Sequence, residues 1–465
     1  MNMRRCLVYL LCGLVTACTF IPKHQQPALP VEDQWDTRAL SPEGQVAFAA
    51  IGWQDFFQTQ PMKDLIEAAL AHNRDLRVAA LQVEAARALY RIDRADLLPH
   101  VDARVSGYHQ RSPEAANVEG VGSTRYTEYS ANVATTNFEL DVFGYIRSRN
   151  QAALESYFAT KAAQDVVATA LIAEVANAYL QWLTDRKIFE LSRQTLDAQE
   201  KTFELIRERY ESGITSKLEL AQVRTSAEAA RANVALYSRR IALDRNALRL
   251  LIGETCPLPE NQTLDQVRVM THLPVGLPSE VLLLRPEVRR AEHILRESNA
   301  NIGAARAAFF PRIALTGSLG FASDAFGELF SSSAAGAWTF VPTITVPIFQ
   351  AGRNKANLEY AELRKEIAIA QYEKAIQVAF REVSDQLDTR AALEEEYQAQ
   401  QAQVASAREA YELSLARYKG GVDSFLSALD AQRFLFQAQI REIEIERLRL
   451  ANVVNLYKAL GGGLH

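Results

Sequence analysis

The stretch of sequence that decides the fold is RIALTGSLGF at residues 312–321, followed by WTFVPTITVPI at residues 338–348. In both segments large apolar residues alternate with small or polar ones, which is the twofold period of a β-strand. One face of each strand is therefore predicted to be apolar and aromatic, as on the outside of a membrane β-barrel, and the other face to be small and polar. The large residues are Ile313, Leu315, Leu319, Phe321, Trp338, Phe340, Ile344, Val346 and Ile348.

A weaker form of this pattern occurs at residues 101–106 and 129–134, so four strands are predicted in all. The segments 109–125 and 322–336 are rich in Gly, Ser and polar residues and are expected to be loops. Proline is found mainly at edges, bulges and strand starts, so Pro342 and Pro347 are expected to be bends near the mouth of the barrel.

Four strands are too few to close a barrel, which needs about eight. Open sheet edges are not tolerated inside a membrane, so other subunits must complete the sheet. Three copies related by cyclic symmetry would supply twelve strands. A small soluble sandwich would need a second apolar layer, and no further strand-like segments supply one.

Two long tracts without Gly or Pro follow the strand pairs, at residues 145–212 and 353–419. As single helices they would each reach roughly 100 Å, about three times the apolar thickness of a bilayer. Shorter tracts follow at residues 214–252 and 422–460. The apolar residues of the long tracts are small and widely spread, which favours helices with neighbours on two sides. A long solvent-exposed coiled-coil rod is the alternative that the helices alone leave open.

The glycines that bound these tracts recur at a constant offset of 208, and so does RYESG at residues 209–213 as RYKGG at residues 417–421. Two internal repeats are therefore predicted, at residues 61–252 and 280–465, each with a helix, a strand pair, a long helix and a short helix. A Pro-rich linker at residues 253–279 would join them. The matching glycines are Gly144, Gly213 and Gly253 with Gly352, Gly421 and Gly461.

The N-terminus has the pattern of an export signal, with two arginines followed by an apolar run. VTAC at residues 15–18 resembles a bacterial lipobox, which predicts a signal peptide at residues 1–17, cleavage before Cys18 and acylation of Cys18. A lipidated, extended segment would then cover residues 18–60. Of the four cysteines only Cys256 would remain free, so a disulfide framework is excluded.

The composition argues against several other classes of protein. The net charge is −5, and it becomes −7 if Arg4 and Arg5 leave with the signal, so there is no basic field to bind nucleic acid. No mature stretch approaches the ~20 continuous apolar residues of a membrane helix. The seven histidines are scattered, without ligand spacing, and no Gly-rich phosphate loop follows a strand. We therefore expect no enzyme activity and no cofactor besides the lipid on Cys18.

Several motifs resemble those of the TolC outer-membrane factor family, in the OprM-like lipoprotein branch that serves resistance-nodulation-division (RND) multidrug pumps. The resemblance covers nearly the whole mature chain. It implies a homotrimer with an outer-membrane β-barrel, a periplasmic α-helical tunnel and an equatorial collar built from the N-terminal segment, the linker and the C-terminus. The motifs are LRPE at residues 284–287, ANIGAARAAFFP at residues 300–311, GVDS at residues 421–424, LDAQR at residues 429–433 and LYKALGGG at residues 456–463.

The same resemblance implies a location and partners. Thr19 follows Cys18 in place of Asp, so by analogy nothing retains the protein at the inner membrane. The partners would be outer-membrane lipid, a periplasmic membrane-fusion adaptor and an inner-membrane RND proton–drug antiporter. A channel for protein secretion by an ABC-driven, type I system shares the fold and is the first alternative, and metal-ion efflux is a closer one. A soluble coiled-coil protein is the alternative from a different class.

The resemblance also implies a gate at the periplasmic end, where the turns at Gly213 and Gly421 would lie. Leu426 and Asp430, one helical turn apart, would face the threefold axis as an apolar constriction and as a negative ring that selects against anions. The alternatives are core packing for Leu426 and a solvated surface acid for Asp430.

Contacts that hold this gate shut are implied as well. Tyr418 and Glu219 match positions that tie the inner to the outer helix pair in the family. Asp423 occupies a position that holds a gate-locking arginine in some relatives, so that part of the lock is expected to differ here.

Overall fold

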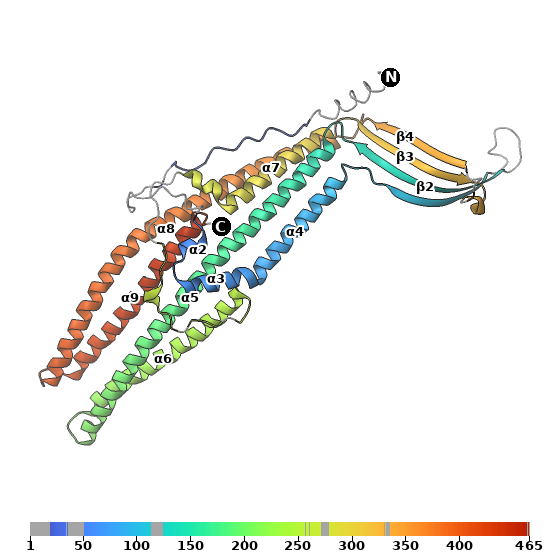
Figure 1. Cartoon of the computed structure of the whole chain (residues 1–465). Helices are drawn as coiled ribbons and strands as arrows, with labels where there is room; N and C mark the ends of the chain where they lie inside the picture. Colours follow the sequence, from blue (N-terminus) through green and yellow to red (C-terminus); the bar gives the residue numbers. More distant parts are fainter. Residues whose placement is uncertain are drawn as a thin grey trace. The chain divides into compact units, whose positions relative to one another are not determined.

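The computed structural model describes residues 19–33, 35, 51–112, 124–255, 257–259, 261–270, 279–329, 331, 335–462 and 464. The predicted signal peptide, Cys18 and Cys256 lie outside these residues. The described elements are α2 (Trp53–Phe56), α3 (Gln60–His72), α4 (Arg74–Ala95), β1 (Asp102–Ser112), β2 (Thr124–Leu140), α5 (Tyr145–Glu211), α6 (Lys217–Ile252), the short 3-10 helices η3 (Leu264–Gln266) and η4 (Ser279–Leu284), α7 (Pro286–Ala307), β3 (Arg312–Ser323), the 3-10 helix η5 (Phe326–Glu328), β4 (Ala335–Thr345), α8 (Arg353–Lys419) and α9 (Phe425–Ala459) (Figure 1).

The chain divides into two compact units. The first consists of Met1–Pro27, Val83–Thr160 and Ala291–Tyr372 and holds the β-sheet. The second consists of Ala28–Gln82, Lys161–Arg290 and Glu373–His465 and holds the two helical hairpins, α5–α6 and α8–α9. Helices α4, α5, α7 and α8 contribute residues to both units.

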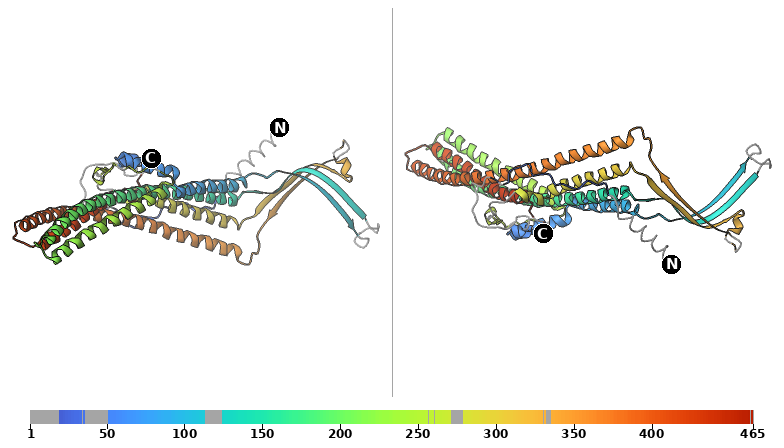
Figure 2. Two further views of the ribbon diagram at one scale, coloured as in Figure 1. Left: turned by 90° about the horizontal axis from the view of Figure 1, so that it is seen from below. Right: turned by 90° about the horizontal axis from the view of Figure 1, so that it is seen from above.

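The sheet of the first unit is antiparallel with the strand order β1-β2-β3-β4, so β1 and β4 are its edges. Val133 lies opposite Leu319, and Leu319 lies opposite Trp338. Directly opposed residues share one face of a sheet, so these three side chains form an apolar row, and they are 53%, 71% and 73% exposed. The strands form one curved layer, and the described α-helical segments of the same unit cover neither face (Figure 2).

The other face of the sheet is small and polar. Ser318 and Thr339 share a hydrogen bond of 2.7 Å across β3 and β4, and Ser106 and Ser130 share one of 2.9 Å across β1 and β2. The four strands that the sequence predicts are therefore present in one sheet per chain, with the division into faces that the alternation indicates.

The predicted strand ends were wrong in two places. The segments 109–125 and 322–336 were expected to be loops, yet β1 continues to Ser112, β2 begins at Thr124 and β3 runs to Ser323. Polar and aromatic side chains extend the ladder here, because they bond across it: His109 Nδ1 lies 3.3 Å from Thr127 Oγ1, and the rings of Tyr108 and Tyr126 make an edge contact.

Pro342 differs from the expectation of a bend near the mouth. Pro342 lies inside β4, opposite Leu315. Proline lacks an N–H to donate, and within the sheet of a single chain β4 is an edge strand, where proline is tolerated. Pro347 follows the last residue of β4, and so do Val346 and Ile348, which the alternation had placed in the strand.

The two long helices match the tracts without Gly or Pro: α5 and α8 have 67 residues each. The shorter helices begin three residues later than their tracts, at Lys217 and Phe425, because the intervening residues form the turn. At α6 the side chain of Ser216 caps the helix and accepts a hydrogen bond from the N–H of Glu219 at 3.1 Å. This cap explains the later start of α6.

Glycines with positive φ lie at the boundaries of the helical tracts. The described glycines with positive φ are the six that the repeat spacing singles out, with φ between 71° and 83°. At the α5–α6 turn, Gly213 donates to the carbonyl of Tyr210 and Ile214 donates to that of Arg209. At the α8–α9 turn, Gly421 and Val422 donate to the carbonyls of Tyr418 and Arg417 in the same way. Both turns use the left-handed glycine that ends many helices.

Three distant segments of the chain meet in the core of the second unit. The ring of Tyr457, near the C-terminus, stacks on Phe56 with centroids 3.9 Å apart, and its hydroxyl donates to the carbonyl of Ile51 at 2.7 Å. Phe57 forms a β-bridge with Val269 of the linker.

Among the described residues, α5 has a window long and apolar enough to cross a membrane, but most of that window is buried in the protein, as in a core helix.

Candidate functional site at the hairpin ends

The ends of the two hairpins in the second unit are joined by a polar contact centred on Tyr418. Its hydroxyl accepts a hydrogen bond from Arg209 Nη1 of α5 at 3.0 Å and donates one to Glu219 Oε1 of α6 at 3.3 Å. Burial, with a further contribution from the Glu219 carboxylate, raises the pKa of Tyr418. The phenol therefore keeps its hydrogen and remains a donor, so one side chain of α8 bonds to both helices of the other hairpin.

Glu219 is oriented by its own turn. Ser216 and Glu219 have the spacing of a capping box, in which the glutamate would bond back to the serine N–H. Here one carboxylate oxygen instead accepts from the Thr215 hydroxyl, and the other accepts from Tyr418. The turn thus directs the carboxylate toward α8.

An apolar cluster lies beside this contact. It contains Ile206 of α5, Val223 of α6 and Phe425, Ala428 and Leu429 of α9, all buried. The ring of Tyr418 packs against Phe425 with centroids 4.8 Å apart. Burial of these side chains holds the two hairpins together, and the hydrogen bonds of Tyr418 add directional contacts.

Asp423 lies in the α8–α9 turn and bonds within its own hairpin. Its carboxylate accepts hydrogen bonds from Arg417 Nε at 2.5 Å and Nη2 at 3.3 Å. These bonds hold the pKa of Asp423 below its usual value. The acid thus neutralises the arginine that corresponds, at the offset of 208, to Arg209 of the first hairpin.

Leu426 and Asp430 lie on α9 beside the buried cluster, and both are exposed. Leu426 is 41% exposed, and the Asp430 side chain is 61% exposed. Asp430 Oδ1 lies 3.4 Å from Arg433 Nη1, one turn along the same helix. An exposed leucine and an exposed acid in adjacent turns are available to line an opening.

The contacts between the hairpins include residues to which sequence reasoning assigned no role. In the sequence Arg209 stands out only as part of the repeat, and nothing there indicates its bond to Tyr418. The same holds for Gln199 of α5, which donates to Gln432 of α9 at 2.5 Å. A single sequence carries no signal for these contacts, because their partners lie more than 200 residues away.

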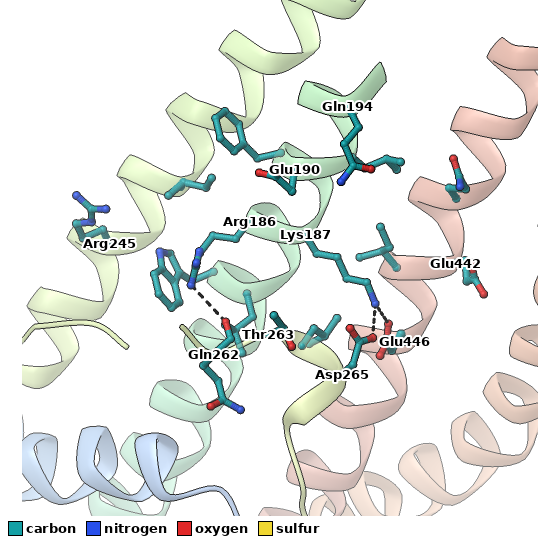
Figure 3. Close-up of a pocket in the computed structure, with 18 of the residues that line it drawn as sticks. Arg186, Lys187, Glu190, Gln194, Arg245, Gln262, Thr263, Asp265, Glu442 and Glu446 are labelled. Atoms are coloured by element: carbon teal, nitrogen blue, oxygen red, sulfur yellow. Dashed lines mark hydrogen bonds and ion pairs between the residues drawn. The ribbon is translucent and has the colours of Figure 1, made fainter. Parts of the chain in front are cut away.

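A second feature of this unit is a cavity of about 730 Å³ between α5, α6, α9 and linker residues 262–265 (Figure 3). Lys187 bonds there to Asp265 and, at 2.8 Å, to Glu446. Burial opposes the charge on Lys187, but its hydrogen bonds to both carboxylates outweigh burial and raise its pKa. The cluster ties the linker to α5 and α9.

In the part of the chain that the structure describes, no group of three or more His, Cys, Asp or Glu is arranged to hold a metal ion.

Comparison with known proteins decides the family. Residues 65–254 and residues 277–462 both match the family described as outer membrane efflux protein. The chain belongs to this outer membrane efflux protein family. The match agrees with the family that the sequence motifs indicated.

The relatives of this outer membrane efflux protein are channel components. The probable efflux pump outer membrane protein TtgC of Pseudomonas putida is 45% identical over 455 residues, which cover 97% of this chain and 93% of that protein. Outer membrane protein OprJ of Pseudomonas aeruginosa is 41% identical, with 96% and 93% covered. The crystal structure of the open state of the Neisseria gonorrhoeae MtrE outer membrane channel superposes with a TM-score of 0.87 at 38% identity, covering 96% of this chain and 99% of that one. The protein is therefore an efflux channel of the outer membrane.

Proposed function

We propose that this efflux protein works as a homotrimer that forms the exit duct of a tripartite RND-type pump. The observation that carries the proposal is the sheet of the first unit, which has an exposed apolar face and two open edges, β1 and β4. The apolar face suits contact with lipid. The open edges are not stable in a bilayer, where every backbone polar group needs a partner. Three copies, each pairing its β1 with the β4 of the next, would close a barrel of twelve strands.

The helices that flank the sheet support the same assembly. Helix α4 leads into one edge strand, and α8 follows the other. Each carries exposed apolar residues in the first unit: Leu89 and Ile92 on α4, and Tyr360 and Leu363 on α8. A trimer would bring α4 of one copy against α8 of the next and bury both rows, which extends the barrel as a helical tube.

The chain is proposed to consist of two internal repeats. Two matches to one family, two helices of 67 residues and six positive-φ glycines at a constant offset support this duplication. We propose boundaries at residues 61–252 and 280–465, with the linker, the N-terminal segment and the C-terminus forming a collar. The stacking of Phe56 on Tyr457 and the bridge between Phe57 and Val269 support the collar.

The N-terminus is proposed to be anchored through a lipid on Cys18, after removal of residues 1–17. The partners are proposed to be a periplasmic membrane-fusion adaptor and an inner-membrane RND proton–drug antiporter, and the duct itself carries no catalytic activity and no cofactor. Relatives are named for efflux of toluene, solvents and antibiotics. We propose a similar cargo of small toxic compounds for this chain.

The gate is proposed to lie at the hairpin ends, with Leu426 and Asp430 facing the threefold axis. Tyr418 and Glu219 hold the hairpins together, and Asp423 fixes the α8–α9 turn through Arg417. The exposure of Leu426 and Asp430 beside a buried cluster supports this arrangement, because a side chain that lines an opening must be free of its own protomer's core.

The function is tested by deletion and complementation. Cells that lack the protein should become more sensitive to solvents and hydrophobic antibiotics, and a plasmid copy should restore resistance. Secreted proteins should be unchanged in the same cells. Lost secretion with unchanged drug sensitivity would favour the type I secretion alternative. Lost resistance to metal ions alone would favour metal efflux.

The assembly is tested by cross-linking between edge strands. One cysteine on the apolar row of β1, at Val105, and one on that of β4, at Phe340, should give SDS-resistant dimers and trimers in membranes. The matched control places both cysteines on the central strands, at Val133 and Leu319, and should give only cross-links within one chain because these residues already face each other. Monomers alone from the edge pair would contradict the trimer.

A further inference from the structure

Near the hairpin ends, one stripe of residues on α9 packs against α5 and α6. Phe425, Leu429 and Gln432 follow at intervals of four and three, which places them on one face of the helix. Phe425 and Leu429 are buried against Ile206 of α5 and Val223 of α6. Leu426 and Asp430 each follow a member of this stripe by one residue, about 100° around the helix. The rotation of α9 against α5 therefore decides where Leu426 and Asp430 point.

The apolar part of the stripe does not set that rotation by itself. Burial of Phe425 and Leu429 changes little when α9 turns or slides slightly, because the hydrophobic effect depends on area and not on direction. A hydrogen bond is directional and short in range. The stripe contains one such bond, from Gln199 Nε2 to Gln432 Oε1 at 2.5 Å.

The Gln199 amide can form its hydrogen bond to Gln432 in only one position of α9. Its residue is 3% exposed, so a displaced Gln432 would leave the Gln199 amide without a partner in a buried interface. Its other amide atom, Oε1, already has no hydrogen-bond partner within the described residues. Gln432 follows Asp430 by two residues, so the bond acts on α9 at the level of the exposed acid.

We propose that Gln199 is a positioning residue for the gate. Its bond to Gln432 fixes the rotation of α9 about its axis and its position along that axis, and so the direction in which Leu426 and Asp430 point. The proposal rests on the proposed gate function of these two residues. The bond differs in kind from the Tyr418–Glu219 contact, because neither amide titrates. Closure through Gln199 is therefore independent of pH.

The chain supplies a matched control in the same interface. Asn177 Nδ2 of α5 donates to Asn455 Oδ1 of α9 at 3.0 Å, and Asn177 also has a buried oxygen without a described partner. This pair joins the same two helices with the same functional groups. It lies 22 residues from Gln199 along α5, which is roughly 33 Å at 1.5 Å per residue.

The test replaces both members of each pair by leucine in the full-length protein. Leucine has as many side-chain heavy atoms as asparagine and one fewer than glutamine, so most of the packing remains while the directional bond is lost. The purified proteins are compared in planar bilayers in KCl, with thermal unfolding as the measure of stability. Gln199→Leu with Gln432→Leu should raise the closed-state conductance several-fold at unchanged or higher stability. Asn177→Leu with Asn455→Leu should leave conductance at the parental level.

Three results decide the matter. Equal conductance increases for the two pairs would overturn the proposal, because they would show a general weakening of the α5–α9 interface. No increase for either pair, with a leak in the Tyr418→Phe, Glu219→Gln variant, would overturn it and leave the gate standing. No leak in any variant would refute the gate itself, and the role of Gln199 with it.

A second pair of variants covers failure of the double leucine protein to fold. Gln432→Met keeps the length of the side chain and loses the acceptor, whereas Gln432→Glu keeps an acceptor for Gln199. Higher conductance for the methionine variant than for the glutamate variant supports the positioning role. Equal conductance of the two overturns it.

Discussion

The hydroxyl of Tyr418 donates to a carboxylate oxygen of Glu219 at 3.3 Å and so joins α8 of one hairpin to α6 of the other. Burial raises the pKa of Tyr418, so the phenol remains a donor at any physiological pH. A bond that holds two hairpins together near an exposed Leu426 and Asp430 should resist their separation.

The double change Tyr418→Phe with Glu219→Gln should therefore let the hairpins separate. Phenylalanine keeps the ring contact with Phe425 and removes the donor, and glutamine removes the charged acceptor. We expect several-fold higher conductance in planar bilayers and greater sensitivity of cells to large antibiotics. Tyr411→Phe is the control, because Tyr411 also lies on α8 but packs against a different apolar cluster. Parental conductance in the double variant would show that the Tyr418–Glu219 contact does not keep the hairpins together.

Asp430 should control which ions pass. Three exposed carboxylates around one axis would attract cations and repel anions, so Asp430→Asn should lower the cation-to-anion permeability ratio several-fold. The reversal potential in a KCl gradient measures this ratio. Glu409→Gln, which removes an exposed charge from α8, should leave it unchanged. An unchanged ratio in Asp430→Asn would identify Asp430 as an ordinary surface acid that is paired with Arg433.

Much of the fold could be predicted because backbone constraints are visible in one sequence. Only glycine adopts positive φ at little cost, so Gly213 and Gly421 mark the ends of the two long helices in the sequence. The alternation at residues 312–321 identifies a strand for a similar reason, since neighbouring side chains point to opposite faces. The strand ends were harder to place, because Tyr108 and Tyr126 extend the ladder through side-chain contacts that follow no apolar pattern.

The candidate site was only partly predictable. Tyr418 and Glu219 came from family resemblance, and their contact is a property of two helices that approach each other from distant parts of the chain. Arg209 and Gln199 look like ordinary solvent-facing residues in the sequence. Their partners, Tyr418 and Gln432, become visible only when the hairpins are packed side by side.

Arg285, in the LRPE motif, should be a main determinant of stability. Its side chain is 3% exposed, donates to Glu382 at 2.7 Å and to Glu287 at 3.4 Å, and packs under Gly461 near the C-terminus. Arg285→Met removes these bonds and should cost about 1.5–3 kcal/mol, the usual worth of hydrogen bonds to charged groups. Thermal unfolding followed by circular dichroism measures the loss. Arg289→Met, on the exposed face of α7, is the control, and equal effects of the two changes would contradict a special role for Arg285.

Stability should also depend on pH through a pair of acids in the first hairpin. Asp185 of α5 is buried, accepts from Gln181 at 3.2 Å and lies 3.8 Å from Arg240. Burial and the neighbouring Asp185 carboxylate raise the pKa of Asp244 on α6 to about 7. The folded protein therefore keeps a proton between about pH 4 and pH 7 that the unfolded chain has released. Stability should fall as pH rises through this window and level off above pH 7.

Asp244→Asn should remove this dependence, because asparagine resembles the protonated acid and does not titrate. At pH 5 the variant should unfold near the parental temperature, since Asp244 is protonated there. At pH 8 it should unfold several degrees higher than the parent, because the repulsion between the carboxylates of Asp244 and the buried Asp185 is gone. Melting curves at pH 5, 6, 7 and 8 in one detergent test this, with Asp197→Asn on the exposed face of α5 as the control. A constant difference between Asp244→Asn and the parent across these pH values would show that the two acids do not share a proton.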